Sequence, residues 1–338
     1  MLKRYLLVRF SSIGDVVLTT SLIELLAGNQ PRCEIHFITL DRNRPILEGN
    51  PHLTKIISLP ADTAPKALRN FAAQLSNYDY DVCLDLHNSL RSKYLRWRMK
   101  DCRWNRFSKP RLSRFLLFYL TIDRFHQNYE VTREYANLIQ NGSIEERVPP
   151  PRIYLSDEEH NRVDILLANE GVRDDFVVVV PSAAWKAKEW SPQAYGEMIA
   201  LLKQKTGMPV VLLGTQDSAA CDQVHEANHG TVNLKGRTGL REAFATLSRA
   251  RLVVGGDTGL VHASEAVGTP VVMITGPTSW QTGAHVRHTS SGELAADVWC
   301  RPCSKDGSRS CYRSRQYCMT EISAEMVAKA AMQILAEA

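Results

Sequence analysis

The 338-residue sequence lacks several features that mark common classes of protein. No window holds the roughly 18 uninterrupted apolar residues that a membrane-spanning helix needs, and the segment Phe115–Leu120 comes nearest. Neither Gly-x-Gly-x-x-Gly nor a Walker P-loop is present, which argues against a dinucleotide-dependent dehydrogenase and a nucleoside triphosphatase. The apolar start, Met1–Phe10, lacks a small-residue cleavage site, so we interpret it as the first strand of a cytoplasmic protein rather than a signal peptide.

The composition is that of an ordinary globular protein, with 44% hydrophobic and 23% charged residues. The length favours two domains of roughly 150 residues each. A proline run at 147–151 suits neither a helix nor a sheet interior, so we predict an N-terminal domain at 1–148 and a C-terminal domain at 149–338. We also expect the final helix to pack back on the N-terminal domain.

Short apolar segments alternate with helical patterns in both halves, which predicts parallel sheets built from βαβ units. The expected fold is therefore α/β, with two doubly wound Rossmann-like domains and ligands in a cleft beyond the carboxyl ends of the strands. The predicted strands are 4–10, 34–40, 55–59, 81–86, 176–180, 209–213, 252–254 and 270–274. The predicted helices are 15–27, 64–77, 192–206, 218–228, 240–249, 258–267 and 324–337.

The most informative segment is 253–264, where a buried strand runs into a glycine-rich helix start. Unpaired backbone N–H groups and the helix dipole make such a junction suitable for an anion such as phosphate. The alternative is that Gly255, Gly256 and Gly259 merely relieve steric strain in a tight turn. A second strand, at 176–180, leads into small residues and then lysines, so Ser182 and Lys188 are further candidate phosphate ligands. Two such loops fit a diphosphate.

The turn after the first strand places Asp15 at the start of an amphipathic helix. Asp15 either complements the helix dipole or acts as a general base that the dipole keeps ionised. Its place at the carboxyl end of a strand favours the base. After another buried strand, His87 is a candidate substrate contact, although a polar loop role remains the alternative.

The segment 91–114 contains ten Lys or Arg residues against one acid, Asp101. This local charge favours a polyanionic partner, with a solvated basic face as the alternative. Nucleic acid ranks low because no recognised binding module accompanies the charge.

Asp79 and Asp81 form an Asp-x-Asp pattern, but they precede their strand, so we discount them as metal ligands. For Cys300, Cys303, Cys311 and Cys318, a structural metal, disulfides and reduced thiols all remain open.

Six motifs together resemble the ADP-heptose:lipopolysaccharide heptosyltransferases of glycosyltransferase family 9 over essentially the whole chain. They are Ser-Ser-Ile-Gly-Asp at 11–15, Asp-Leu-His-x-Ser-Leu-Arg-Ser at 85–92, Pro-x-Ala-x-Trp-x-x-Lys-x-Trp at 181–190, Gly-Asp-Thr-Gly-Leu-x-His-Ala at 256–263, Gly-Pro-Thr at 276–278, and the cysteine-rich tail that ends in Cys318-Met319.

This resemblance implies a GT-B fold, inversion at the anomeric carbon, no metal or cofactor beyond the co-substrate ADP-heptose, and Asp15 as the base. It also implies a phosphorylated glycolipid acceptor at the inner face of the membrane. The donor-binding residues that we expect are Ser182, Lys188, Asp217, Asp257, Thr258, Gly259, Leu260 and His262. The acceptor-binding residues that we expect are Ser12, Gly14, His87, Asn88, Ser89, Arg91 and Lys93.

Three other functions stay open on the sequence. One is a GT-B transferase that uses another nucleotide sugar or a protein acceptor. Another is a sugar-nucleotide epimerase, against which the basic segment argues because an epimerase needs no polyanionic acceptor surface. The third is a non-catalytic sugar-nucleotide-binding protein, which would need Lys188 and the Thr258 loop but not Asp15.

Overall fold

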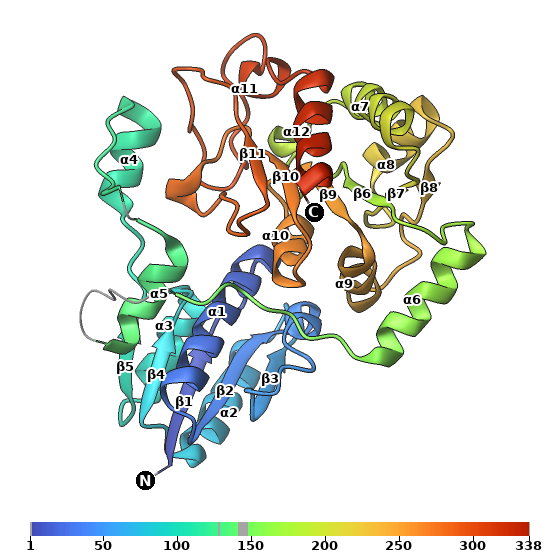
Figure 1. Cartoon of the computed structure of the whole chain (residues 1–338). Coiled ribbons are helices and arrows are strands. Elements are labelled where there is room, and N and C mark those ends of the chain that lie inside the picture. Colours follow the sequence, from blue (N-terminus) through green and yellow to red (C-terminus); the bar gives the residue numbers. More distant parts are fainter. Residues whose placement is uncertain (1, 128, 141–147, 338) are drawn as a thin grey trace. The chain divides into compact units, whose positions relative to one another are not determined.

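A computed structural model describes residues 2–127, 129–140 and 148–337 (Figure 1). The chain divides into two compact units, of which the first comprises 1–109 and 129–154 and the second comprises 110–128 and 155–338. The chain thus passes to the second unit after Tyr154, beyond the proline run. The segment 110–128, counted with the N-terminal domain on the sequence, belongs to the second unit. Arg147 of the predicted boundary lies outside the described residues.

The first unit is built on a five-stranded sheet in the order β3-β2-β1-β4-β5, in which every pair is parallel. Val8, the last residue of β1, pairs with Ile38 on one side and Asp85 on the other. The carboxyl ends of these central strands therefore meet at one edge of the sheet. The strands are β1 (Lys3–Val8), β2 (Cys33–Leu40), β3 (Lys55–Leu59), β4 (Val82–Asp85) and β5 (Arg103–Arg106).

Helices follow these strands and cover the sheet (Figure 1). The first helix begins after Ser12 and is buried along most of its length, so it forms part of the core. Ser89 caps α3 by accepting a hydrogen bond from the backbone N–H of Ser92. The helices of this unit are α1 (Ile13–Asn29), α2 (Pro65–Leu75), α3 (Leu90–Arg98) and α5 (Val131–Gln140).

The second unit contains a six-stranded parallel sheet in the order β11-β10-β9-β6-β7-β8. Its central strands β6 and β9 are buried along their whole length, as the continuous apolar sequence of a doubly covered parallel strand predicts. The strands are β6 (Val177–Val180), β7 (Val210–Leu212), β8 (Val232–Asn233), β9 (Leu252–Gly256), β10 (Val271–Ile274) and β11 (Gly292–Leu294).

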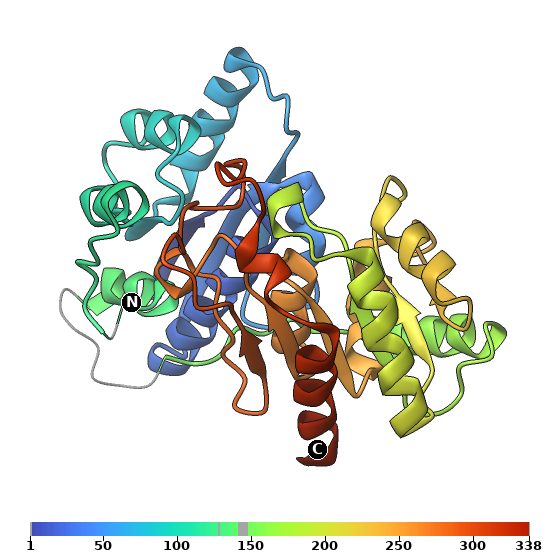
Figure 2. The same ribbon diagram turned by 90° about the horizontal axis from the view of Figure 1, so that it is seen from above.

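The last helix packs beside α7 in the second unit, as both views show (Figures 1 and 2). Its residues Val327, Ala328 and Ala331 lie in the core cluster of that unit. The last helix is therefore part of the core of the second unit. The helices are α4 (Arg111–Leu120), α6 (Asp157–Asn169), α7 (Pro192–Thr206), α8 (Ala219–Ala227), α9 (Leu240–Arg249), α10 (Gly259–Ala266), α11 (Tyr317–Thr320) and α12 (Ala324–Glu337).

The predicted α/β class with two parallel sheets is confirmed. Within the described ranges, no helix combines the length and the apolar character needed to cross a membrane.

Candidate active site

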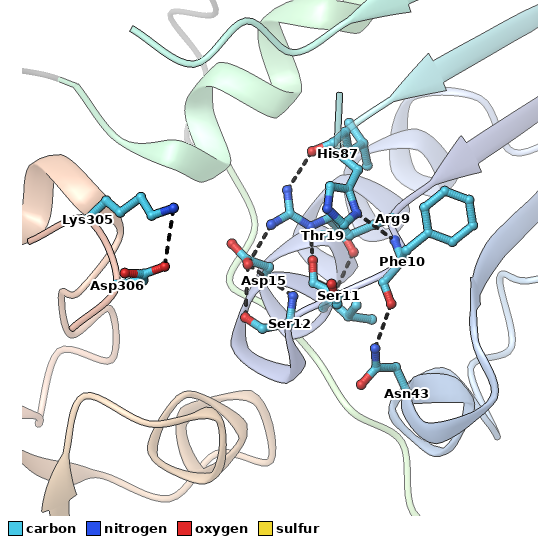
Figure 3. Close-up of polar contacts among 12 residues, drawn as sticks. Arg9, Phe10, Ser11, Ser12, Asp15, Thr19, Asn43, His87, Lys305 and Asp306 are labelled. Atoms are coloured by element: carbon cyan, nitrogen blue, oxygen red, sulfur yellow. Dashed lines mark hydrogen bonds and ion pairs between the residues drawn. The ribbon is translucent and has the colours of Figure 1, made fainter. Parts of the chain in front are cut away.

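Asp15 lies in the first turn of α1, directly after the carboxyl end of the central strand β1 (Figure 3). Its Oδ2 accepts hydrogen bonds from the Ser12 backbone N–H at 3.1 Å and from the Ser12 hydroxyl at 2.9 Å. These contacts form a capping box at the start of the helix. The Asp15 side chain remains 39% exposed, so a substrate can still reach the carboxylate.

Arg9, which sequence reasoning missed as a site residue, contacts the same carboxylate oxygen. Its Nη2 lies 2.5 Å from Asp15 Oδ2, although the arginine side chain itself is only 2% exposed. Arg9 also donates to the Ser11 carbonyl at 2.7 Å, the Leu86 carbonyl at 2.6 Å and the Tyr135 hydroxyl at 3.2 Å. The only sequence signal was a charged residue that interrupts an apolar strand end.

The electrostatics of this turn keep Asp15 ionised. Partial burial raises the pKa of the carboxyl, but the charge of Arg9, the hydrogen bond from the Ser12 backbone and the charge of Lys109 together bring it well below its ordinary value. An aspartate in this state can accept a proton from a substrate hydroxyl at neutral pH. The helix-capping role and the general-base role are compatible with this geometry.

A second strand end supplies a buried carboxylate that shapes a turn. Asp85, the last residue of β4, is fully buried and accepts hydrogen bonds from the backbone N–H groups of His87 at 3.1 Å and Asn88 at 2.7 Å. Arg96 Nη1 lies 3.0 Å from its other oxygen. Asn88 has a φ of 54°, a left-handed conformation that asparagine tolerates.

This turn holds His87 in one protonation state. The Phe10 backbone N–H donates to His87 Nδ1 at 3.1 Å, which requires Nδ1 to be unprotonated. Burial and the charges of Arg9 and Lys109 lower the pKa of His87 to about 4. The imidazole is therefore neutral at physiological pH and carries its proton on Nε2, which can donate to a substrate oxygen.

The basic segment is less uniform than its sequence suggests. Lys93 is exposed on α3, and Arg91 donates to the Ala61 carbonyl. Arg96, by contrast, is paired with buried Asp85, and Arg114 of the second unit donates to the Gln281 carbonyl at 3.4 Å. Seven of the ten basic side chains of segment 91–114 are nevertheless exposed, namely Lys93, Arg98, Lys100, Arg103, Arg106, Lys109 and Arg111. Of the remaining predicted acceptor residues, Ser89 caps α3 and Gly14 is buried in the first turn of α1.

In the second unit, four polar side chains meet at the carboxyl end of β9. Asp257 is buried and its Oδ2 lies 2.6 Å from Lys188 Nζ, while the Thr278 hydroxyl donates to the same oxygen at 2.8 Å. Its Oδ1 accepts from His262 Nε2 at 3.1 Å. Burial raises the pKa of Asp257, but His262 and Lys188 bring it well below the ordinary value. Lys188, Asp257 and His262 were predicted as donor ligands, and the structure brings them together; Thr278 was missed.

Two glycines lie close to Lys188, Gly256 against its backbone carbonyl and Gly307 against its side chain. A Cβ on Gly256 would lie 2.6 Å from the Lys188 carbonyl oxygen. A Cβ on Gly307 would lie 2.6 Å from Lys188 Cγ, and the φ of Gly307 is +85°, in the left-handed region. Glycine is therefore required at both positions, and together they confine the lysine.

The start of α10 presents polar atoms that no described residue satisfies. Thr258 is the N-cap residue, and Gly259 and Leu260 form the first turn. The Thr258 hydroxyl and His262 Nδ1 are buried without a hydrogen-bond partner among the described residues. At a helix N-terminus the Thr258 hydroxyl can donate to a bound anion, whereas His262 Nδ1 is an acceptor because Nε2 carries the proton that goes to Asp257. Ser182 is half-buried and Asp217 is exposed, and neither side chain makes a hydrogen bond or ion pair with another described residue.

The cysteines show one feature that the sequence did not predict. Cys83 of β4 and Cys102 form a disulfide. Cys300, Cys303, Cys311 and Cys318 are free thiols, and burial raises the pKa of Cys318 to about 11. Among the residues that the structure describes, no three His, Cys, Asp or Glu side chains are arranged to hold a metal ion. Asp81 lies at the amino end of β4, where its carboxylate accepts from the Arg4 backbone N–H at 2.7 Å.

Comparison with known proteins assigns the chain to a family. The model of glycosyltransferase family 9 (heptosyltransferase) matches residues 68–312, which is more than half of the chain. The chain belongs to glycosyltransferase family 9. A lipooligosaccharide heptosyltransferase 2 of Haemophilus influenzae is 27% identical over 288 residues, covering 80% of this chain and 82% of the relative.

Solved structures of this family share the fold over nearly the whole chain. A family 9 glycosyltransferase from Veillonella parvula has a TM-score of 0.80 at 19% identity, covering 99% of this chain and 98% of that one. The ADP-heptose lipopolysaccharide heptosyltransferase II of Escherichia coli has a TM-score of 0.75 at 20% identity, covering 99% of both. The fold is therefore GT-B, with two Rossmann-like domains. A more distant match, at 15% identity and a TM-score of 0.61, is the iron-containing dodecameric glycosyltransferase TibC of enterotoxigenic E. coli, covering 99% of this chain and 77% of that one.

Proposed function

We propose that this family 9 glycosyltransferase transfers heptose from ADP-heptose to a hydroxyl of the lipopolysaccharide inner core, with inversion at the anomeric carbon. The observation that carries the proposal is the ionised, partly exposed carboxylate of Asp15, held at the carboxyl end of β1 in a chain of this family. The names of the H. influenzae relative and of the structurally similar E. coli enzyme support the choice of donor and acceptor.

In the proposed reaction, Asp15 accepts the proton of the acceptor hydroxyl as its oxygen attacks the anomeric carbon. The new bond joins this oxygen to the carbon, and the bond from the carbon to the phosphate oxygen breaks. Its electron pair leaves with ADP. A positioned carboxylate base of this kind accelerates a reaction by roughly 10²- to 10⁴-fold.

The Lys188 cluster would stabilise the departing diphosphate. Lys188 is held by Asp257, and the Thr258 hydroxyl, which no described residue satisfies, lies at the start of α10. Fixed donors of this kind stabilise charge that develops in the transition state. We place the diphosphate on these groups and on the backbone of Gly259 and Leu260. Ser182 and the exposed carboxylate of Asp217, on the ribose hydroxyls, would complete the donor contacts.

The acceptor would be a phosphorylated glycolipid bound by the first unit. His87 supplies an Nε2–H donor, Arg91 and Lys93 supply positive charge, and Ser12, Gly14, Asn88 and Ser89 line the two turns. Replacing Lys93 by Met should raise the acceptor KM and flatten its salt dependence without changing donor affinity, because screening weakens exposed charges. A fall in donor affinity instead would show that the domain assignment is wrong.

We further propose that the enzyme works in the cytoplasm, peripherally at the inner membrane, and binds no nucleic acid. Support comes from α4 of the second unit, an amphipathic helix that exposes Leu112, Phe115 and Tyr119 beside Arg111. Apolar side chains flanked by arginine suit an anionic lipid surface. Sedimentation with anionic but not zwitterionic vesicles would support this assignment, and binding to neither kind of vesicle would refute it.

Metal independence is also a proposal, supported by the cationic groups already present for the diphosphate. Activity should survive chelation. Loss of turnover in chelator that Mg²⁺ or Mn²⁺ restores would overturn it, whereas unfolding in chelator would identify a structural metal at the cysteine-rich segment.

The proposed function as a whole is tested by turnover with defined truncated lipopolysaccharide acceptors and a panel of nucleotide sugars. We expect ADP-heptose to be used at least tenfold better than ADP-glucose or UDP-sugars, and only with an inner-core acceptor. Binding of ADP-heptose without transfer or hydrolysis would instead favour a non-catalytic binding protein.

A further inference from the structure

The carboxylate of Asp15 is held asymmetrically. The Ser12 backbone N–H, the Ser12 hydroxyl and Arg9 Nη2 all contact Oδ2 (Figure 3). Oδ1 makes no hydrogen bond with any other described residue. One oxygen of the carboxylate is therefore anchored, and the other is available to a substrate.

We propose that Arg9 is a positioning residue that anchors Oδ2 of Asp15 and thereby assigns Oδ1 as the atom that accepts the proton of the acceptor hydroxyl. This inference rests on the proposed function, because it gives an atomic role within the reaction that Asp15 would catalyse. Arg9 itself touches neither substrate nor reacting atom; it acts through Asp15.

The surroundings of Arg9 make it suited to this role. Its guanidinium is buried and donates from Nε to the Ser11 carbonyl and from Nη1 to the Leu86 carbonyl and the Tyr135 hydroxyl, so Nη2 is left to point at Asp15. A planar guanidinium held at three other points has a fixed direction. A lysine, with a single ammonium on a flexible chain, could keep the charge near Asp15 but not this geometry.

The charges around the pair set the direction of a pH test. Lys109, after β5, and His87, after β4, interact electrostatically with Asp15. Tyr135 of α5 and Asp85 of β4 interact with Arg9. With Arg9 removed, Lys109 remains as the positive charge near Asp15, so the pKa of Asp15 should rise while the carboxyl stays ionised at neutral pH.

The test is the pH profile of kcat for Arg9→Met and Arg9→Lys. In the wild type, the low pKa of Asp15 should keep its protonation out of the profile above about pH 4. In Arg9→Met, compared in a His87→Gln background because Arg9 also lowers the pKa of His87, we expect an acidic limb to enter the profile above about pH 4. We also expect kcat at neutral pH to fall by about 10²-fold, as misplacement of a reacting group predicts. A higher pKa alone would make Asp15 a stronger base, so the expected fall isolates the loss of position.

Matched variants separate this role from a purely structural one. Arg4→Met removes another arginine that has a carboxylate partner, Glu34, and should leave the profile unchanged. Arg9→Lys keeps a positive charge near Asp15, so its pH profile should show no acidic limb above about pH 4, as in the wild type. Its kcat at neutral pH should nevertheless stay close to that of Arg9→Met. Tyr135→Phe removes one hydrogen-bond acceptor of Arg9 and is a milder variant if Arg9→Met does not fold. We expect it to lower kcat by several-fold without adding an acidic limb to the pH profile above about pH 4.

A double-variant experiment distinguishes failure of this inference from failure of the proposed function. In an Asp15→Asn background, Arg9→Met should cause no further loss of kcat, because the two residues act through one carboxylate. Near-normal kcat in Asp15→Asn alone would overturn the proposed function. Loss of activity in Asp15→Asn together with an unchanged kcat, or an unchanged pH profile, in folded Arg9→Met would overturn the role of Arg9 only.

Discussion

The ion pair between Lys188 and Asp257 yields a prediction about both stability and donor binding. The Lys188 and Asp257 side chains are 14% and 8% exposed, so replacing Lys188 by Met leaves a nearly buried carboxylate without its cation. Removing one partner of a buried pair costs about 3–5 kcal/mol. We expect Lys188→Met to lower the free energy of unfolding by about 3 kcal/mol, the low end of this range, because Thr278 and His262 still donate to Asp257. For a unit of this size, this corresponds to a fall in Tm of about 6–12 °C.

Lys186 provides a matched control two residues earlier in the same turn. Its side chain is 86% exposed and pairs with Glu189, so Lys186→Met should lower stability by less than about 1 kcal/mol. Titration calorimetry with ADP should show about a 10- to 100-fold weaker Kd for Lys188→Met, the loss of a charge-assisted hydrogen bond, and no change for Lys186→Met.

The pH dependence of the same variant follows from the low pKa of Asp257 in the folded protein. A carboxylate with a depressed pKa contributes stability that is complete above its unfolded pKa, about 3.9, and that is lost as the pH falls further. The difference in Tm between wild type and Lys188→Met should therefore be full at neutral pH and narrow below about pH 4. Equal Tm values for the Lys186 and Lys188 variants at neutral pH would refute this reasoning.

Two further predictions concern the positioning of site residues. Replacing His87 by Gln should raise the acceptor KM and leave ADP affinity unchanged. The pH profile of wild-type kcat/KM should show no inflection near the ordinary histidine pKa of about 6.5. The reason is that the His87 imidazole, with its pKa of about 4, is already neutral at that pH. An inflection that disappears in the Gln variant would contradict this state. Gly307→Ala should weaken ADP binding because its Cβ would collide with Lys188. Gly171 is the control: its φ of +79° is similar, but no atom lies within 4 Å of its Cβ position, so Gly171→Ala should lower stability only. Equal ADP affinity in the two variants would count against the confinement of Lys188.

Much of the fold was predictable because most of its strands are apolar and most of its helices periodic. Pro192–Thr206 and Leu240–Arg249 have the predicted bounds, since a helix-starting proline or glycine and a regular apolar face mark them. The strand β5 was not predicted, because its sequence Arg-Trp-Asn-Arg is short and charged and it is stabilised by its parallel neighbour β4.

The site was predictable residue by residue but not as pairs. Lys188 and Asp257 were each expected to contact the donor, yet their mutual ion pair depends on β6 and β9 lying side by side, and strand order is not encoded in any local pattern. Arg9 was not predicted for the same reason: its partners at Leu86 and Tyr135 are distant in sequence and meet it only in the folded unit.

The central claim is that Asp15 is the catalytic base, and Asp15→Asn tests it most directly. The amide keeps the shape of the side chain but cannot accept the proton of the acceptor hydroxyl. Asp41, an exposed acid that follows the neighbouring strand β2, provides the matched control as Asp41→Asn. We predict that the Asp15 variant folds, binds ADP-heptose normally and has kcat at least about 100-fold below that of the wild type and the Asp41 variant. A folded Asp15→Asn with near-wild-type kcat would contradict the account and leave Asp15 with a structural role only, as a helix-capping residue and the partner of the buried Arg9.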